Sequence, residues 1–269
     1  MRQCAQDDPG TLSIRRGLEE GTNVRKKTLL EQTLILIKPD ALRNSLTGYV
    51  LSQLSEFHVG LRFAGAKVVR VTRILAEEHY AEHRGKLFYP ALIDYIMGKS
   101  HYPDEEQKRR VIAIVYQGPN AVARTREITG PTNPHDARLD KPGSIRSLGT
   151  VVPLKSSEGE VIGQRMDNLV HASATCEESE REIKLWFKPS DIPPLMRAYP
   201  VQQSDAHFYY DEGKLYNAYQ PGSVCILTPG EPVWESDLNA LHLIHQGSPS
   251  PYSLATAVAK YLPADMDED

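Results

Sequence analysis

The chain has 269 residues, of which 31 are Lys or Arg and 35 are Asp or Glu, giving a formal net charge of -4. This length allows one large domain, or a domain of ordinary size with an appendage. The acidic balance excludes a general attraction to nucleic acid or to an anionic membrane, so any bound anion must be held by local cations.

Cysteine usage and the N-terminal residues indicate the cellular compartment. Cys4, Cys176 and Cys225 are far apart and form no Cys-x-x-Cys pair, which argues against a disulfide framework and a thiolate zinc site. The first residues, MRQCAQDDPG, contain no apolar signal core, and the apolar runs are too short to span a bilayer. We therefore expect a cytoplasmic protein.

The hydrophobic pattern predicts a folded core that begins after a polar arm. Residues 1–30 are polar and mixed in charge, and we expect them to form a flexible arm. TLILIK, residues 33–38, is an apolar strand that Pro39 ends. The elements expected next are a helix over 50–57, a strand over 61–72, helices over 77–84 and 91–97, a strand over 111–118 and a helix over 119–130.

The last core elements complete the predicted fold class. DNLVHAS, residues 167–173, predicts a fourth strand, and Thr175 with Glu178 forms a capping box at the start of the next helix. This order predicts an α+β fold with a ferredoxin-like antiparallel four-stranded sheet, which helices cover on one face.

The composition changes at about Pro189, where KPSDIPP, residues 188–194, is typical of a linker. We therefore divide the chain into the arm, a core domain over 31–189 and a C-terminal extension over 190–269. Within the extension, HFYYDEGKLYNAY predicts two aromatic strands around a turn, with a short strand over 224–227 and two helices after it. We expect a small α+β unit.

His171 stands between an apolar strand and two small residues, with an acidic helix directly after it. A lone histidine in such a place is commonly a packed core residue. Alternatively, it acts as a nucleophile, which requires one exposed ring nitrogen and a carboxylate on the other nitrogen. Glu182, on the following helix, could supply that carboxylate, and both explanations remain open from these residues alone.

Basic and polar residues stand at the ends of several predicted core elements, where loops gather into sites: Lys38, Arg126, Thr132, Asn133, Arg146 and Asn168. Taken singly, each has an ordinary explanation as a solvated strand end or helix face. Together, two arginines and a lysine in one cleft would form a phosphate site.

Several motifs, in this order, resemble the nucleoside diphosphate kinases: TLILIKPDALRN, HYAEHRGKLFYPALIDYIM, NAVARTREITGPTNP, KPGSIR, and NLVHAS followed by EESEREIKLWF. The resemblance covers about residues 32–187 and leaves the arm and the extension unexplained. It implies a ping-pong reaction in which His171 takes the γ-phosphate of a nucleoside triphosphate and passes it to a diphosphate. It also implies that ATP and other nucleoside tri- and diphosphates are partners, and that the protein forms a homo-oligomer.

The resemblance assigns a role to each matching residue. The catalytic group would be His171, Glu182, which orients its ring, Lys38, Tyr80 and Ser173, which leaves room for the phosphoryl group. The nucleotide would be held by Lys38, Phe88, Leu92, Arg126, Thr132, Arg146 and Asn168. Phe88 would stack on the base, which gives weak base discrimination. Mg2+ would arrive on the nucleotide phosphates, so we expect no protein metal ligands.

The chain departs from the family pattern around the histidine and at Arg146. Ala172 replaces a glycine, so its methyl could crowd the backbone, and Ala174 replaces an aspartate. Ser147 and Leu148 follow Arg146 in place of Gly-Asp. Two segments are also longer than the pattern. We expect residues 98–110 to form a surface loop, whereas residues 149–166 either line the cleft or form a surface hairpin.

Three hypotheses follow for function. The first is an active kinase, favoured because the matching residues occur together. The second is a weakly active or inactive binding or regulatory protein that uses the extension for a partner, and the third is a structural oligomer with an incidental histidine site. A separate motif, HYAEH over residues 79–83, matches the H-x-x-E-H pattern of zinc proteases, but a surface helix is the expected explanation.

Overall fold

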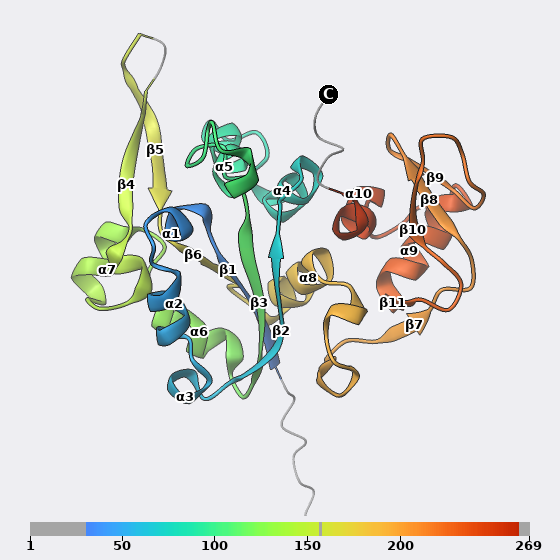
Figure 1. Ribbon diagram of the computed structural model, residues 1–269, viewed down its shortest axis with the longest axis horizontal. Helices are drawn as coiled ribbons and strands as arrows, with labels where there is room; N and C mark the ends of the chain where they lie inside the picture. Colours follow the sequence, from blue (N-terminus) through green and yellow to red (C-terminus); the bar gives the residue numbers. More distant parts are fainter. Residues whose placement is uncertain (1–30, 156–157, 264–269) are drawn as a thin grey trace, which may run out of the picture.

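The computed structural model describes residues 31–155 and 158–263 (Figure 1). The predicted N-terminal arm, residues 1–30, lies outside the described residues. Within the described ranges, no helix combines the length and the apolar character needed to cross a membrane.

A four-stranded antiparallel sheet with the order β2-β3-β1-β6 forms the centre of the core, as predicted. Its strands are β1 (Glu31–Ile37), β2 (Arg62–Val69), β3 (Val111–Gly118) and β6 (Val170–Ala172). The fourth strand is shorter than expected, because Asp167 ends a separate strand and Leu169 has a left-handed backbone with φ 67°.

Helices pack on both faces of this sheet, so the prediction of one covered face was wrong. Leu34 and Leu36 of β1 pack in one hydrophobic cluster, and Ile35 and Ile37 pack in another. The first cluster includes α4 (Arg73–His79), α5 (Tyr89–Ile96) and α8 (Cys176–Trp186). The second includes α1 (Pro39–Arg43), α2 (Thr47–Gln53), α3 (Glu56–Val59) and α6 (Ala121–Thr129). The unbroken apolar run of β1 is what a strand buried on both faces requires.

Residues 149–166 contain most of a two-stranded hairpin that is separate from the central sheet. Its strands are β4 (Thr150–Lys155) and β5 (Val161–Asp167), which pair in antiparallel fashion. The hairpin projects from the body of the protein near α7 (Pro134–Asp140) (Figure 1). Short 3-10 turns complete the described chain: Ala81–His83, Glu106–Lys108, Ile145–Leu148, Pro189–Asp191, Pro194–Met196 and Ala259–Tyr261.

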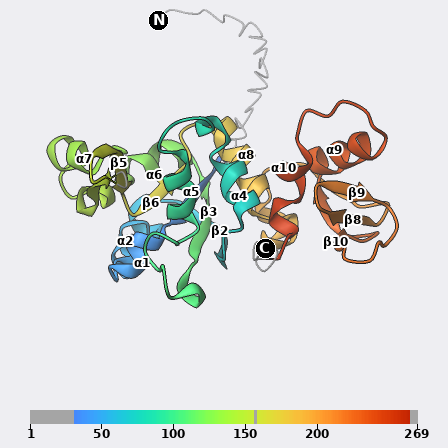
Figure 2. The same cartoon turned by 90° about the horizontal axis from the view of Figure 1, so that it is seen from above.

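The C-terminal extension contains the predicted strands and helices and lies at the end of the molecule opposite the hairpin (Figure 2). One sheet has the order β10-β8-β9, with β8 (Phe208–Asp211), β9 (Lys214–Tyr216) and β10 (Val224–Leu227). The closing helices are α9 (Glu235–His245) and α10 (Leu254–Val258). A second pair, β7 (Val201–Gln203) with β11 (Pro232–Trp234), was not predicted.

The extension packs closely on the core. The buried indole of Trp234 donates to the carbonyl oxygen of Phe187 at 2.7 Å. Thr256 Oγ1 donates to Glu78 Oε2 at 2.6 Å, which joins α10 to α4. Ile192, in the segment expected to be a linker, is fully buried in the cluster that contains Trp186. Pro189 and Ile192 therefore tie this segment to the core, whereas Ser190, Pro193 and Pro194 are exposed.

Candidate active site

A cavity of about 420 Å³ lies among the end of α4, the start of α5, the strands β5 and β6, and α8. It collects all but two of the predicted site residues: Lys38, Tyr80, Phe88, Leu92, Arg126, Thr132, Arg146, Asn168, His171 and Glu182. The exceptions are Ser173, which is fully buried, and Asn133, whose side chain instead caps α7 by accepting from the backbone N–H of His135 at 2.9 Å.

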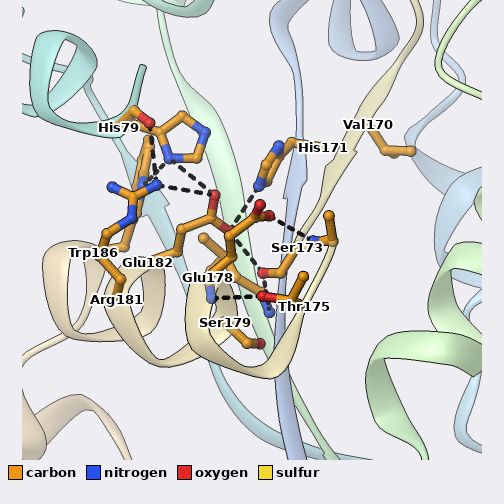
Figure 3. A network of polar contacts seen from close by, with 12 residues as sticks. His79, Val170, His171, Ser173, Thr175, Glu178, Ser179, Arg181, Glu182 and Trp186 are labelled. Atoms are coloured by element: carbon orange, nitrogen blue, oxygen red, sulfur yellow. Dashed lines mark hydrogen bonds and ion pairs between the residues drawn. The ribbon is translucent and has the colours of Figure 1, made fainter. Parts of the chain in front are cut away.

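His171 and Glu182 meet because β6 leads directly into α8. Thr175 caps α8 by accepting a hydrogen bond from the backbone N–H of Glu178 at 3.1 Å, as predicted. Glu182 lies one turn further along the helix, and its Oε2 is 2.8 Å from His171 Nε2 (Figure 3). Ser173 Oγ donates to the same oxygen at 2.6 Å.

The carboxylate fixes which nitrogen of His171 is available. Burial opposes the charged form of Glu182, but His171 and the hydrogen bonds from His171 and Ser173 lower its pKa to about 2. An ionised carboxylate only accepts, so the proton of the neutral imidazole resides on Nε2 and the lone pair on Nδ1. The hydrogen bonds found within the described chain leave Nδ1 without a partner. His171 therefore presents a nucleophilic nitrogen.

His79 lies on the buried face of α4, whereas Arg73 at the start of this helix is exposed, so the expectation of a surface position was wrong for His79. It is 3% exposed, and its ring lies 4.5 Å from the ring of His171 (Figure 3). Trp186 Nε1 donates to His79 Nδ1 at 3.2 Å, which leaves the proton of His79 on Nε2. Burial, and then the charge of His171, lowers the pKa of His79 to about 3. The ring is therefore neutral near pH 7.

His79, His171 and Glu182 have ligand atoms within 4.8 Å of one another, and they are the one such group found among the described residues. Their nitrogen-rich composition suits a transition metal better than Mg2+, which takes oxygen ligands. His83, the second histidine of the H-x-x-E-H motif, is not in this group and contacts Lys86 instead. The motif therefore does not form a protease-type zinc site.

Lys38 directly follows β1, at the N-cap of α1, and lines the cavity. Its Nζ donates to Asn168 Oδ1 and lies 4.5 Å from the centre of the Tyr95 ring. Asn168 Nδ2 in turn donates to the carbonyl oxygen of Thr132 at 2.7 Å. Burial lowers the pKa of Lys38 to about 8, so the side chain is largely cationic at neutral pH.

The backbone between Asn168 and β6 is held in a strained conformation. Leu169, with its positive φ, donates its N–H to Asp40 Oδ2 at 2.8 Å. Its carbonyl oxygen accepts from the backbone N–H of Lys38 at 2.9 Å. These bonds pin the loop before His171 to the turn after β1, which holds Lys38 and Asn168 together.

Two arginines add positive charge to the cavity. Arg146 is buried and donates to the carbonyl oxygens of Gly130 at 2.9 Å and Val170 at 3.2 Å. Burial, and then the neighbouring charge of Arg126, lowers the pKa of Arg146 to about 10. A bound anion would relieve this repulsion, as expected of a phosphate site.

Tyr80, Phe88 and Leu92 form another part of the cavity wall. Burial raises the pKa of Tyr80 above its usual value, so its hydroxyl is a neutral hydrogen-bond donor. Phe88 is 40% exposed at the start of α5 and offers an aromatic face to a ligand.

The departures at Ala172 and Ser147 preserve this geometry. Ala172 pairs with Ile35 within β6, and it is absent from the described non-glycine residues with positive φ. Its methyl therefore does not strain the backbone. Ser147 Oγ donates to the carbonyl oxygen of Ser144 at 2.6 Å within the turn that carries Arg146.

The cavity also contains residues that the sequence analysis did not assign to the site: His79, Tyr95 and Glu178. Residues 149–166 were expected either to line the cleft or to form a surface hairpin, and they do both, because the hairpin contributes Leu154, Gln164, Arg165 and Met166 to the cavity wall. Helical spacing could have indicated His79, because it shares the buried face of α4 with Leu75 and Ala76. Residues 98–110 were expected to form a surface loop, but His101 is buried and lies 2.8 Å from Asp167. No periodic pattern in the sequence points to that contact.

Comparisons with known proteins identify relatives of the core. A family model described as nucleoside diphosphate kinase matches residues 31–192. The nucleoside diphosphate kinase of Pyrococcus furiosus is 38% identical over 185 residues, covering 69% of this chain and 96% of that protein. The Thermus thermophilus protein of the same name is 36% identical over 163 residues, covering 61% and 99%. A solved nucleoside diphosphate kinase from Aquifex aeolicus has 30% identity and a TM-score of 0.48, covering 61% and 99%.

Proposed function

Because the chain belongs to the nucleoside diphosphate kinase family, we propose that its cavity transfers the γ-phosphate of a nucleoside triphosphate to a nucleoside diphosphate through a phosphohistidine at His171. The observation that carries the proposal is the 2.8 Å contact between His171 Nε2 and Glu182. It leaves Nδ1 free in a cavity that Lys38, Arg126 and Arg146 make positive.

The reaction has two matching halves. In the first, Nδ1 attacks the γ-phosphorus, the bond to the β–γ bridging oxygen breaks, and the diphosphate leaves with that electron pair. The imidazole becomes positive as the N–P bond forms, and the Glu182 carboxylate stabilises this charge. In the second half, a terminal oxygen of another diphosphate attacks the phosphorus and returns the electron pair to Nδ1.

The remaining residues position the nucleotide. Arg126, Arg146 and Thr132 hold phosphate oxygens, while Lys38 and Tyr80 contact the transferred group. Lys38 and Asn168 also bind the sugar hydroxyl, and Phe88 with Leu92 packs on the base. Ser173 acts indirectly, because its hydroxyl orients the Glu182 carboxylate.

We assign Mg2+ as the metal that enters with the nucleotide. The carboxylates lining the cavity are Glu82, Glu178 and Glu182, of which Glu182 is engaged by His171 and Ser173. Glu178 accepts from the backbone N–H of Ala174 at 2.9 Å. These side chains form no oxygen cage, which fits an ion held by phosphate oxygens and water. When bound, Mg2+ neutralises phosphate charge.

The same proposal extends to the domains, the oligomeric state and the location of the protein. Residues 31–189 form the catalytic domain and residues 190–269 an appended unit, and copies of the chain assemble as a homo-oligomer in the cytoplasm. Light scattering coupled to size exclusion would measure the number of copies. The free nucleophile and its carboxylate favour an active enzyme over a binding protein without phosphotransfer.

Incubation with γ-labelled ATP and Mg2+, followed by a GDP chase, tests the proposal. We expect an acid-labile, alkali-stable label on the protein that moves to GDP, and we expect His171→Ala to abolish it. His58→Ala, which changes an exposed histidine outside the cavity, is the matched control and should label normally. Labelling that persists in His171→Ala would contradict the assignment.

A further inference from the structure

The two segments that are longer than the family pattern meet at one wall of the cavity. His101 comes from residues 98–110, and Arg165 comes from residues 149–166. Both contact Asp167 at the end of β5: His101 Nε2 lies 2.8 Å from Asp167 Oδ2. Arg165 forms two contacts with the same carboxylate, from Nε to Oδ1 at 2.6 Å and from Nη2 to Oδ2 at 3.1 Å.

This network fixes the Arg165 side chain at the cavity. A bidentate pair holds the guanidinium plane in one orientation, and the contact with His101 fixes the carboxylate in turn. His101 and Asp167 are both buried, whereas Arg165 remains partly exposed and lines the cavity. The Arg165 guanidinium also lies 5.9 Å from the centre of the Tyr95 ring, another lining residue.

Arg165 differs from Arg126 and Arg146 in its electrostatic surroundings. Arg126 and Arg146 repel each other, which favours binding of an anion. Arg165 is already paired with Asp167. The net charge of this pair is close to zero, so it attracts a phosphate less strongly than an unpaired arginine does. Its planar face does not take part in the hydrogen bonds to Asp167, and such a face stacks well on aromatic rings.

The neighbours of Arg165 are suited to the nucleoside rather than to phosphates. Leu154 and Met166 line the cavity from the hairpin, and Phe88 and Leu92 line it from α5. The exposed ring of Phe88 provides one aromatic face for a base. A second flat group from the hairpin would complete a stacking pocket.

We propose that Arg165 stacks on the nucleobase from the hairpin side, held in place by Asp167 and His101, and that the hairpin thereby sets the affinity for the nucleoside. This inference rests on the proposed function, because it assumes that the cavity binds nucleotides. Arg165 is a binding residue, whereas His101 and Asp167 position it.

Equilibrium binding of ADP and of tripolyphosphate to Arg165→Met tests the inference. Methionine keeps an apolar stem and removes the plane, so we expect ADP affinity to fall by about 5- to 100-fold, the range for losing one stacking partner. Tripolyphosphate, which has no base, should bind as to the wild type. In steady-state assays the loss should affect KM more than kcat.

Two further variants test whether the planar shape or the charge of Arg165 is responsible. Arg165→Lys keeps the charge and an ion pair with Asp167 but loses the plane, so it should resemble Arg165→Met. It also replaces Arg165→Met should that variant fail to fold. Lys155→Met removes an exposed cation from the same hairpin and should leave binding unchanged.

Several outcomes would overturn the inference: unchanged ADP affinity in Arg165→Met, an equal loss of tripolyphosphate binding, or recovery of ADP affinity in Arg165→Lys. Failure of the proposed function would be seen separately, as wild-type protein that binds ADP but forms no phosphohistidine from γ-labelled ATP.

Discussion

His79 is a buried neutral imidazole whose pKa is about 3, lowered by burial and then by His171. A histidine in an unfolded chain titrates at about 6.5. Between these values the unfolded chain binds a proton that the folded protein does not bind. The free energy of unfolding therefore falls as the pH decreases from about 6.5 toward 3, with a slope of up to about 1.4 kcal/mol per pH unit from this group.

His79→Gln should reduce this acid sensitivity, because glutamine does not titrate and still offers an acceptor to Trp186. Urea unfolding between pH 4.5 and 7.5 would measure it, and we expect the variant to lose less stability than the wild type toward low pH. His135→Gln, at an exposed histidine of α7, is the matched control. Identical slopes in the wild type and His79→Gln would contradict the buried neutral state.

Among single residues of the site, those that belong to local motifs were predictable from the sequence, and those placed by packing were not. Lys38, Arg146 and His171 stand in recognisable local patterns, and the cavity contains all three. Arg165 has no such pattern, because its place depends on Asp167 and on a histidine that is 64 positions away in the chain.

Among the elements, the β4–β5 hairpin depends on a close backbone approach at its base. A Cβ atom added at Gly149 would lie 2.5 Å from the carbonyl oxygen of Asp167 and 3.0 Å from Asn168 Cα. Backbone atoms cannot rotate away as a side chain does, so the hairpin and Asn168 would have to separate.

Gly149→Ala should therefore lower the free energy of unfolding by about 1–3 kcal/mol, the usual cost of overpacking. Because Asn168 would shift, kcat/KM should fall as well. Gly163→Ala in the same hairpin is the matched control, since its added Cβ would lie no closer than 3.8 Å to Leu154 Cδ1. Equal free energies of unfolding for the two variants would show that the close backbone approach at Gly149 does not exclude a Cβ atom.

Most elements were predictable from periodicity, whereas their contacts were not. The N-cap at Thr175 and the aromatic strands of the extension are local features, and both are present. The Glu178 carboxylate accepts from the backbone N–H of Ala174 rather than that of Thr175, so the predicted capping box is only half formed. The shortened fourth strand was missed because the left-handed backbone of Leu169 is imposed by hydrogen bonds to Asp40 and Lys38. Those partners are distant in sequence.

Across the whole molecule, the core and the extension share hydrophobic packing. Trp234 of the extension belongs to the same cluster as Trp186 and Phe187 of the core, and α10 contacts α4 through Thr256 and Glu78. Composition alone indicated a separate unit after a linker, because it does not reveal which apolar residues pack across the boundary.

Trp234→Ala should destabilise the protein by about 3–5 kcal/mol, as expected for a buried tryptophan. Trp234→Phe should cost less, because it keeps most of the packing and loses mainly the hydrogen bond to Phe187. Urea unfolding followed by circular dichroism would measure both, and we expect one shared transition. An extension that unfolds alone, with the core transition unchanged, would contradict this coupling.

The hydrogen bond from Trp186 to His79 also makes the active site optically accessible. The chain has two tryptophans, and the indole of Trp186 is one ring away from His171, the proposed nucleophile. A dianionic phosphoryl group on His171 would change the electric field at that indole and hence its fluorescence. Trp234, bonded to a backbone carbonyl, would contribute a steady background, so the light emitted by the unlabelled protein would follow each half of the catalytic cycle in real time.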